Sequence, residues 1–150
     1  MGIFDINPST YARYNFIEIP EGDHRVRISK VRFKRCRNDK KFFEITFKVS
    51  RCCGKLWYRM WHNPEYIESS TRTFEKFFDS FQIQDRDHAN YKSWIGKEGG
   101  VHVKHIMNYN KVTGWDTYTA QIVCCICKEN YDKLPPWSDV PEVRFSEDVF

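Results

Sequence analysis

The sequence predicts an all-β fold with one helix, in the order β-β-β-α-β-β, on three observations. Apolar and polar residues alternate in three consecutive segments, residues 24–35, 42–50 and 55–61, and a period of two is typical of strands. Four phenylalanines then recur at helical spacing between residues 74 and 81. Two more alternating segments follow, within residues 94–109 and at residues 118–126. We therefore expect a three-stranded meander, a helix and a hairpin.

The first segment changes the parity of its apolar residues partway along. Val26 and Ile28 share one face, whereas Val31 and Phe33 share the other. One inserted residue near positions 29–30, a β-bulge, would turn all four to the core. The outward residues are then all cationic: Arg25, Arg27, Lys30, Arg32 and Lys34. Solvated faces usually mix both signs of charge, so this row favours an anionic ligand over its alternative, an ordinary solvated face.

The third segment, residues 55–61, carries the clearest functional pattern. Leu56, Tyr58 and Met60 point to the core, and the outward residues are Lys55, Trp57, Arg59 and Trp61. Flat rings between cations suit single-stranded nucleic acid, whose bases stack and whose phosphates need positive charge. The alternative is a sheet covered on both faces, with both tryptophans buried. We expect accessible tryptophans on the face of Arg27 and Arg59, with Tyr58 inside.

The second segment and the connections add further candidates. In residues 42–50, Phe42, Glu44, Thr46 and Lys48 face outward, and Phe43, Ile45, Phe47 and Val49 face the core. Asn63 and Pro64 predict a helix start, and the phenylalanine stripe predicts a core-facing helix to about Phe81. We expect a loop at residues 84–91 and, in the last hairpin, a long exposed tip at residues 108–116 that carries Tyr109, Lys111 and Trp115.

Length and charge indicate one domain, residues 1–135, followed by a flexible acidic tail, residues 136–150. The 150-residue chain has a net charge of +4, but the tail contributes −3, which leaves +7 for the body. No apolar run approaches the ~20 residues of a membrane span, and no signal peptide is visible. We therefore expect a cytoplasmic protein whose six cysteines are reduced, small apolar fillers.

Catalytic patterns are missing from the sequence. It contains no Gly-rich phosphate loop, zinc-hydrolase motif, nucleophile elbow or obvious carboxylate pair. Cys124 and Cys127 have C-x-x-C spacing but lie in a predicted strand, which sends them to opposite faces. We expect no enzymatic activity, no cofactor and no bound metal.

The predicted order of elements is that of a five-stranded Greek-key barrel, the OB-fold, here with an N-terminal arm and a short C-terminal tail. That fold binds oligonucleotides on strands 2 and 3 and on the loops that join strands 1–2 and 4–5. The candidate nucleic-acid-binding residues lie at these places, on the cationic face of the first strand and, for Lys104, on the fourth strand. They are Arg25, Arg27, Arg32, Lys34, Arg35, Arg37, Lys40, Lys41, Phe42, Lys48, Trp57, Arg59, Trp61, Lys104, Tyr109, Lys111 and Trp115.

Several short stretches resemble the OB-fold single-stranded DNA-binding proteins encoded by bacteriophages and prophages. The stretches are residues 19–26 (IPEGDHRV), 43–49 (FEITFKV), 95–98 (IGKE) and 134–137 (LPPW). The resemblance spans about residues 16–137 and implies sequence-tolerant binding of single-stranded DNA during replication or recombination, without catalysis, in a bacterial host cell. The Cys52-Cys53 and Cys124–Cys127 clusters depart from the pattern and leave a redox or metal role open.

The C-terminus is similar to the acidic, aromatic-capped tip through which bacterial single-stranded DNA-binding proteins recruit replication and repair enzymes. The corresponding residues are Glu147, Asp148, Val149 and Phe150; the alternative is a solvated end without a partner. A second function of a different class is a protein-interaction module whose aromatic face docks a polypeptide. The choice between DNA and RNA and the formation of a homo-oligomer stay open.

Overall fold

The computed structural model describes residues 19–62 and 64–141. Its elements are β1 (Gly22–Arg35), β2 (Lys41–Val49), β3 (Lys55–His62), η1 (Pro64–Tyr66), α3 (Ile67–Ser80), η2 (His88–Trp94), β4 (Glu98–Asn110), β5 (Trp115–Cys125) and α4 (Lys128–Asp132). The predicted order of five strands and one main helix is confirmed. The short helices η2 and α4 were not expected from the sequence.

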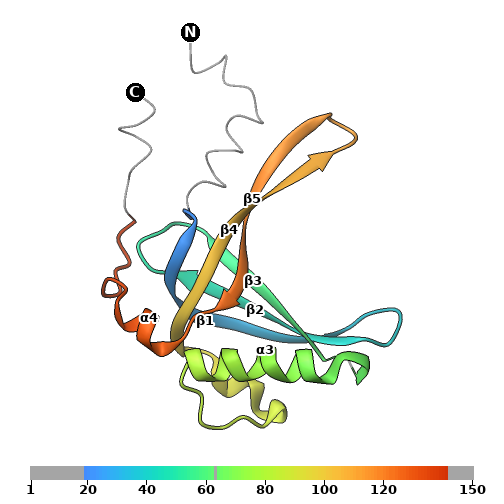
Figure 1. Ribbon diagram of the computed structural model, residues 1–150, viewed down its shortest axis with the longest axis vertical. Helices are drawn as coiled ribbons and strands as arrows, with labels where there is room; N and C mark the ends of the chain where they lie inside the picture. The colour runs from blue at the N-terminus through green and yellow to red at the C-terminus, as the bar shows by residue number, and fades with distance from the viewer. Residues whose placement is uncertain (1–18, 63, 142–150) are drawn as a thin grey trace.

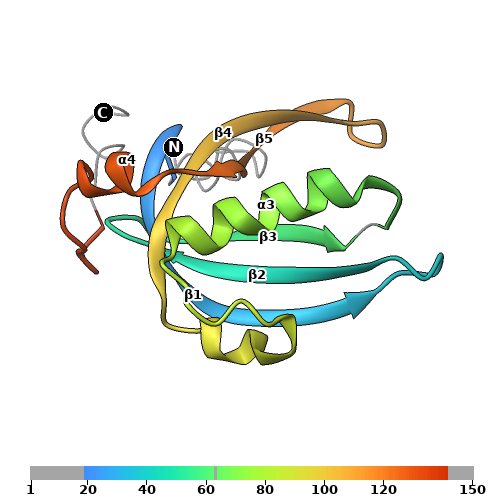
Figure 2. The same cartoon turned by 60° about the horizontal axis from the view of Figure 1, so that its bottom comes forward.

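The five strands form one antiparallel sheet in the order β3-β2-β1-β4-β5. The sheet curves strongly, and α3 lies between β3 and β5 (Figures 1 and 2). These two edge strands approach each other, but within residues 19–62 and 64–141 no hydrogen-bonded ladder joins them. The fold is thus β-rich with one main helix, and its sheet stays open where a barrel would close.

The expected β-bulge lies in the middle of β1. Its register with β2 shifts between Ile28 and Lys30, and Val26, Ile28 and Val31 are all buried. Beyond the bulge β1 pairs with β2 alone, whereas residues 22–27 pair with β4. The bulge therefore keeps the apolar residues on one face while the strand bends from one neighbour to the other.

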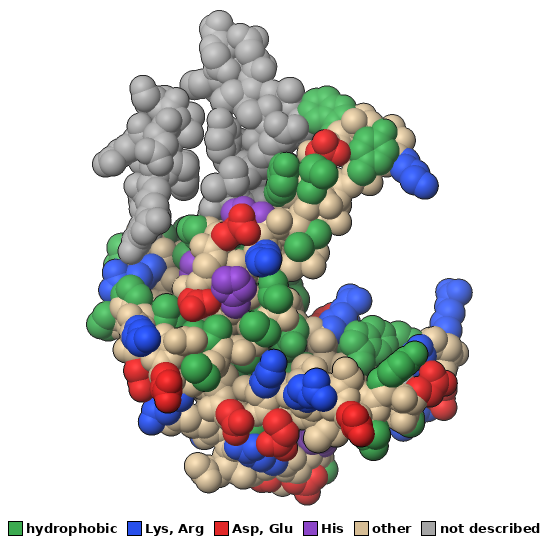
Figure 3. Space-filling model, in the orientation of Figure 1, with side chains coloured by type: hydrophobic (Ala, Val, Ile, Leu, Met, Phe, Trp, Pro, Cys, Tyr) green, Lys and Arg blue, Asp and Glu red, His purple; other side chains and the backbone are tan. Residues whose placement is uncertain are grey.

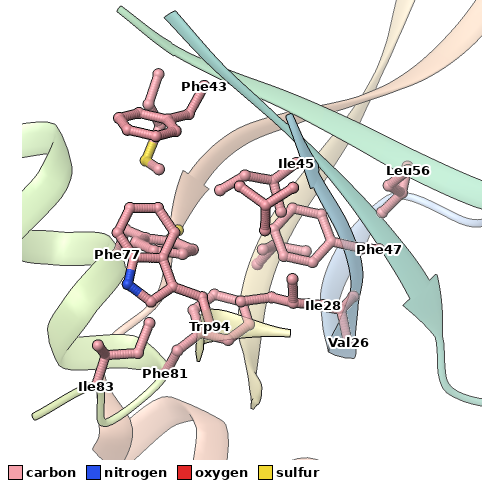
Figure 4. Packing of buried hydrophobic residues seen from close by; sticks show 14 of the residues in the cluster. Val26, Ile28, Phe43, Ile45, Phe47, Leu56, Phe77, Phe81, Ile83 and Trp94 are labelled. Carbon is pink, nitrogen blue, oxygen red and sulfur yellow. The ribbon is translucent and has the colours of Figure 1, made fainter. Parts of the chain in front are cut away.

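The core lies between the sheet and α3 and is dominated by aromatic rings (Figure 4). The phenylalanine stripe is buried as predicted: Phe74, Phe77, Phe78 and Phe81. Trp94, at the end of η2, is fully buried and contacts Phe43 and Phe77 at centroid distances of 5.2 and 5.4 Å. The predicted loop at 84–91 is therefore wrong from His88 onward, because the Asp87 side chain caps η2 and the core holds its last residue.

The last hairpin also differs from its prediction. The expected tip at 108–116 is mostly strand, since β4 runs to Asn110 and β5 begins at Trp115, its register partner. Asn110 closes the short turn by accepting a hydrogen bond from the Val112 N–H at 2.9 Å, and Gly114 has a φ of +71°. The β4–β5 ribbon, residues 104–121, therefore projects from the body as regular structure (Figure 1).

A second bulge, between His102 and Val103, changes the parity of β5 near its end. As a result Cys125 is buried, whereas its neighbour Cys124 is only partly covered. All six cysteines are free thiols. No helix in the described part of the chain has the length and apolar character needed to cross a membrane.

Candidate nucleic-acid interface

The register predicted for β3 is correct. Leu56 and Met60 are buried, and Tyr58 packs against the core, where burial raises its pKa to about 12. On the other face Trp57 is 59% and Trp61 38% exposed. Both tryptophans are thus accessible and flank Arg59 on one outer face, at a spacing of two residues.

Phe42 requires a correction, because it is not an exposed stacking residue. It lies on the outer face of β2, opposite Trp61, but is only 6% exposed. The Trp61 ring covers it at a centroid distance of 4.6 Å, and the Arg59 guanidinium lies 5.3 Å from its ring centre. Phe42 therefore packs beneath the side chains of Trp61 and Arg59 and helps to position them.

Glu44 lies at the centre of the same face, directly opposite Arg59 in the sheet register. Its side chain is 15% exposed; one oxygen accepts a hydrogen bond from Lys34 at 3.1 Å and the other lies 3.5 Å from Arg59 Nε. The hydrogen bond from Lys34, helped by the charges of Lys34, Arg59 and Arg32, holds the pKa of Glu44 below its ordinary value. The predicted site residues Lys34 and Arg59 are therefore tied to a carboxylate, while Arg32 is exposed.

The connection between β1 and β2 forms an open groove of about 770 Å³ beside Trp61. Its turn is closed by a hydrogen bond from the Cys36 N–H to the Lys40 carbonyl at 2.7 Å, with Asp39 at a φ of +66°. Three predicted cations line this β1–β2 groove together with Trp61, and sequence reasoning missed its other two members; the lining is Arg35, Cys36, Arg37, Asn38, Lys40 and Trp61. Lys41 begins β2 directly beside the groove.

At the opposite end of the face, predicted binding residues are used within the protein. Arg25 and Arg27 both form ion pairs with Glu98, each at 3.0 Å. Burial alone would raise the pKa of Glu98, but hydrogen bonds from Tyr131, Arg25 and Arg27 outweigh it and hold that pKa below its ordinary value. Arg25 is mostly covered and is held within the protein, whereas Arg27 is more open but also paired.

The C-terminal strap, residues 133–141, covers this end of the sheet. The Arg27 guanidinium carbon lies 4.0 Å from the centre of the Trp137 ring. The Trp137 indole N–H donates a hydrogen bond to Asp139 at 3.0 Å. Asp139 in turn pairs with Lys48 at 2.9 Å, and this hydrogen bond holds its pKa below the ordinary value. Lys48, another predicted binding residue, is therefore paired with an acid. Trp137 is an aromatic residue of this face that sequence reasoning did not assign to it.

The β4–β5 ribbon carries the remaining predicted residues but does not bring them onto one face. Tyr109 pairs with Asp116 and Trp115 with Asn110, so the two rings point to opposite sides. Lys104 shares the side of Trp115, and Lys111 is exposed in the turn. A hollow separates the ribbon from the β1–β2 end of the body, with Lys or Arg side chains on both sides of its opening (Figure 3).

The predicted C-terminal tip, Glu147, Asp148, Val149 and Phe150, lies outside the described residues, as does Asn63, which was predicted to cap the helix. Among the residues that are described, no group of three or more His, Cys, Asp or Glu side chains is arranged to hold a metal ion. The geometry therefore offers stacking rings, a cationic groove and one central carboxylate. Comparison with models of known protein families and with curated proteins gave no match.

Proposed function

We propose that the protein binds single-stranded DNA without strong dependence on sequence, through base stacking and phosphate neutralisation, and that it acts without catalysis in phage-type replication or recombination. The observation that carries this proposal is the outward row of β3, where Trp57 and Trp61 are accessible and Trp61 borders a groove lined by Arg35, Arg37 and Lys40. A large exposed ring has a solubility cost unless a ligand covers it.

The strand order supports the finer proposal that the sheet is an OB-fold. Strands 1–3 form the meander, the main helix follows β3, and β4 returns to pair with the first half of β1. In OB-folds the outer face of strands 2 and 3 and the loops flanking it bind oligonucleotides. Trp57, Trp61 and the β1–β2 groove lie at these places, and the phage single-stranded DNA-binding proteins are the family we propose.

Stacking and charge have separable signatures in a binding experiment. Each stacked base contributes about 1–3 kcal/mol. Each phosphate neutralised adds about −0.7 to the slope of log K against log salt for single strands. The cations at the β1–β2 groove, Arg35, Arg37, Lys40 and the adjacent Lys41, predict a salt dependence. The exposed rings of Trp57 and Trp61 predict quenching of tryptophan fluorescence.

The experiment is a fluorescence and anisotropy titration with oligo-dT, oligo-rU and duplex DNA at two salt concentrations. We expect quenching by oligo-dT, weaker binding of duplex, and a loss of about 1–3 kcal/mol of binding free energy in Trp57→Ala. Tyr66→Ala is a matched control, because Tyr66 is also an exposed aromatic but lies on η1. Thermal unfolding should be unchanged in both variants.

An absence of binding to any single strand at low salt would refute the proposal. Equal affinity of Trp57→Ala and wild type would remove that ring from the site.

The ribbon favours a second function, a protein-interaction module. Its exposed apolar residues are Ile106, Met107, Tyr109, Val112, Trp115 and Tyr118, and its charged residues in the same stretch are Lys104, Lys111 and Asp116. Few charges and many aromatics are typical of the centre of a protein interface. Salt-insensitive binding of a polypeptide, with no binding of single strands, would favour this function over the first.

A further inference from the structure

Glu44 is the one acid among the outward residues of β2 and β3, which are otherwise aromatic, hydroxylated or cationic. It lies opposite Arg59, and Trp57 and Trp61 stand two residues to either side of Arg59, roughly 7 Å along the strand. A base stacked on either tryptophan would therefore lie within reach of the carboxylate. This inference rests on the proposed function and concerns the same site.

Lys34 and Arg59 fix the carboxylate but do not saturate it. Each partner occupies one position on a different oxygen, and an ionised carboxylate offers about four acceptor positions. The lowered pKa keeps Glu44 ionised at neutral pH, so that it can accept hydrogen bonds but cannot donate them.

Phosphates are attracted to the rim of the face, where Arg35, Arg37 and Lys40 line the β1–β2 groove. A strand whose phosphates follow this rim can turn its bases inward, over Glu44. Cytosine presents an amino group at its C4 edge, whereas thymine presents a carbonyl oxygen at the same place.

We propose that Glu44 accepts a hydrogen bond from the exocyclic amino group of a base stacked beside Trp57 or Trp61, and so makes the site prefer cytosine over thymine. Both bases are pyrimidines of similar size, so stacking and backbone flexibility change little between them. A hydrogen bond to a charged acceptor should separate their affinities by roughly 10-fold.

The test compares oligo-dC with oligo-dT of equal length, bound by wild type and by Glu44→Gln. Wild type should bind oligo-dC more tightly by the expected factor. In Glu44→Gln the ratio should fall to about one, because an amide accepts from cytosine and donates to thymine. Asp39→Asn is the charge-matched control, since Asp39 is an exposed acid next to the same groove; it should keep the wild-type ratio.

A second measurement needs no variant protein. Wild type should bind an oligomer of N4,N4-dimethylcytosine like oligo-dT, because dimethylation removes both amino donors and keeps the ring. Binding of both oligomers without a preference, or an equal gain for both in Glu44→Gln, would overturn the role of Glu44 and leave single-strand binding standing. Failure of both oligomers to bind would refute the proposed function itself.

Discussion

On the outer face of β2 and β3, the role of a side chain depends on its neighbours as well as on its residue type. Phe42 alternates outward like Trp57, yet Trp61 and Arg59 cover it. Alternation along a strand predicts the side to which a residue points. It cannot predict whether a neighbouring strand will cover that residue, because the neighbour's rotamer decides this. The face and parity of Phe42 were thus predictable from the sequence, and its burial was not.

His88 provides a residue-scale prediction about pH. Its ring lies among those of Phe74, Phe43 and Trp94, and its centroid is 4.4 Å from that of Phe74. Burial lowers the pKa of His88 from 6.5. The charge of His62 lowers this pKa further, whereas that of Asp87 raises it. In the unfolded chain the pKa returns to about 6.5. The unfolded state therefore takes up the proton first as the pH falls.

The free energy of unfolding should decrease from about pH 6.5 downward, until the folded pKa is passed. Thermal unfolding between pH 7 and pH 5 measures this loss. His88→Phe keeps an aromatic ring in the cluster and should show a shallower loss over the same range. An identical pH dependence in both proteins would show that His88 is not responsible.

At the scale of elements, α3 and β4 meet where a side chain would not fit. A Cβ on Gly99 would lie 2.7 Å from the Phe81 ring, and that ring is held by Phe47 and Phe77 at 5.5 and 5.0 Å. The helical periodicity predicted that Phe81 is buried. It gave no indication that Gly99, eighteen residues later, provides the space, since such close approach depends on how two elements cross.

Gly99→Ala should therefore destabilise the protein by about 1–3 kcal/mol, because the core must shift to admit the methyl group. Urea unfolding measures the change. The double variant Gly99→Ala/Phe81→Leu is the control, since a smaller side chain at position 81 relieves the overlap, so the two changes should cost less together than their sum. Strict additivity would argue against the contact.

The length of the β4–β5 ribbon was also not predictable from local sequence. Gly and Asn between apolar segments indicate a turn, but a nine-residue tip could not be told from two extended strands by turn chemistry alone. Pairing with the neighbouring strand decides the difference, and the pairing of Asn110 with Trp115 comes from the ladder.

For the whole molecule, Arg25 connects segments far apart in the sequence. It donates to Glu98, to the Tyr131 hydroxyl at 2.6 Å, and to the carbonyls of Pro135 and Leu134. These bonds attach α4 and the C-terminal strap to β1. Arg51 and Ser50 add hydrogen bonds to the strap.

Arg25→Ala should lower the free energy of unfolding by on the order of 3 kcal/mol, since it leaves partly buried polar groups without their partner. Lys30→Ala, which removes an exposed cation from the same strand, should change it by less than about 0.5 kcal/mol. Chemical denaturation compares the two. Equal stability of both variants would show that Arg25 is a surface cation, as the sequence pattern had suggested.

Local spacing in the sequence was enough to determine the order of the elements, the bulge in β1, the buried stripe of α3 and the outward direction of Trp57 and Trp61. Each follows from the periods of two and 3.6, which depend only on backbone geometry. The tertiary structure alone decided which outward residues are free. Glu98 pairs with both Arg25 and Arg27, Asp139 pairs with Lys48, and Glu44 lies opposite Arg59, between the two tryptophans. Ion pairs between distant segments form only when folding brings the charges together, so local sequence patterns do not predict them.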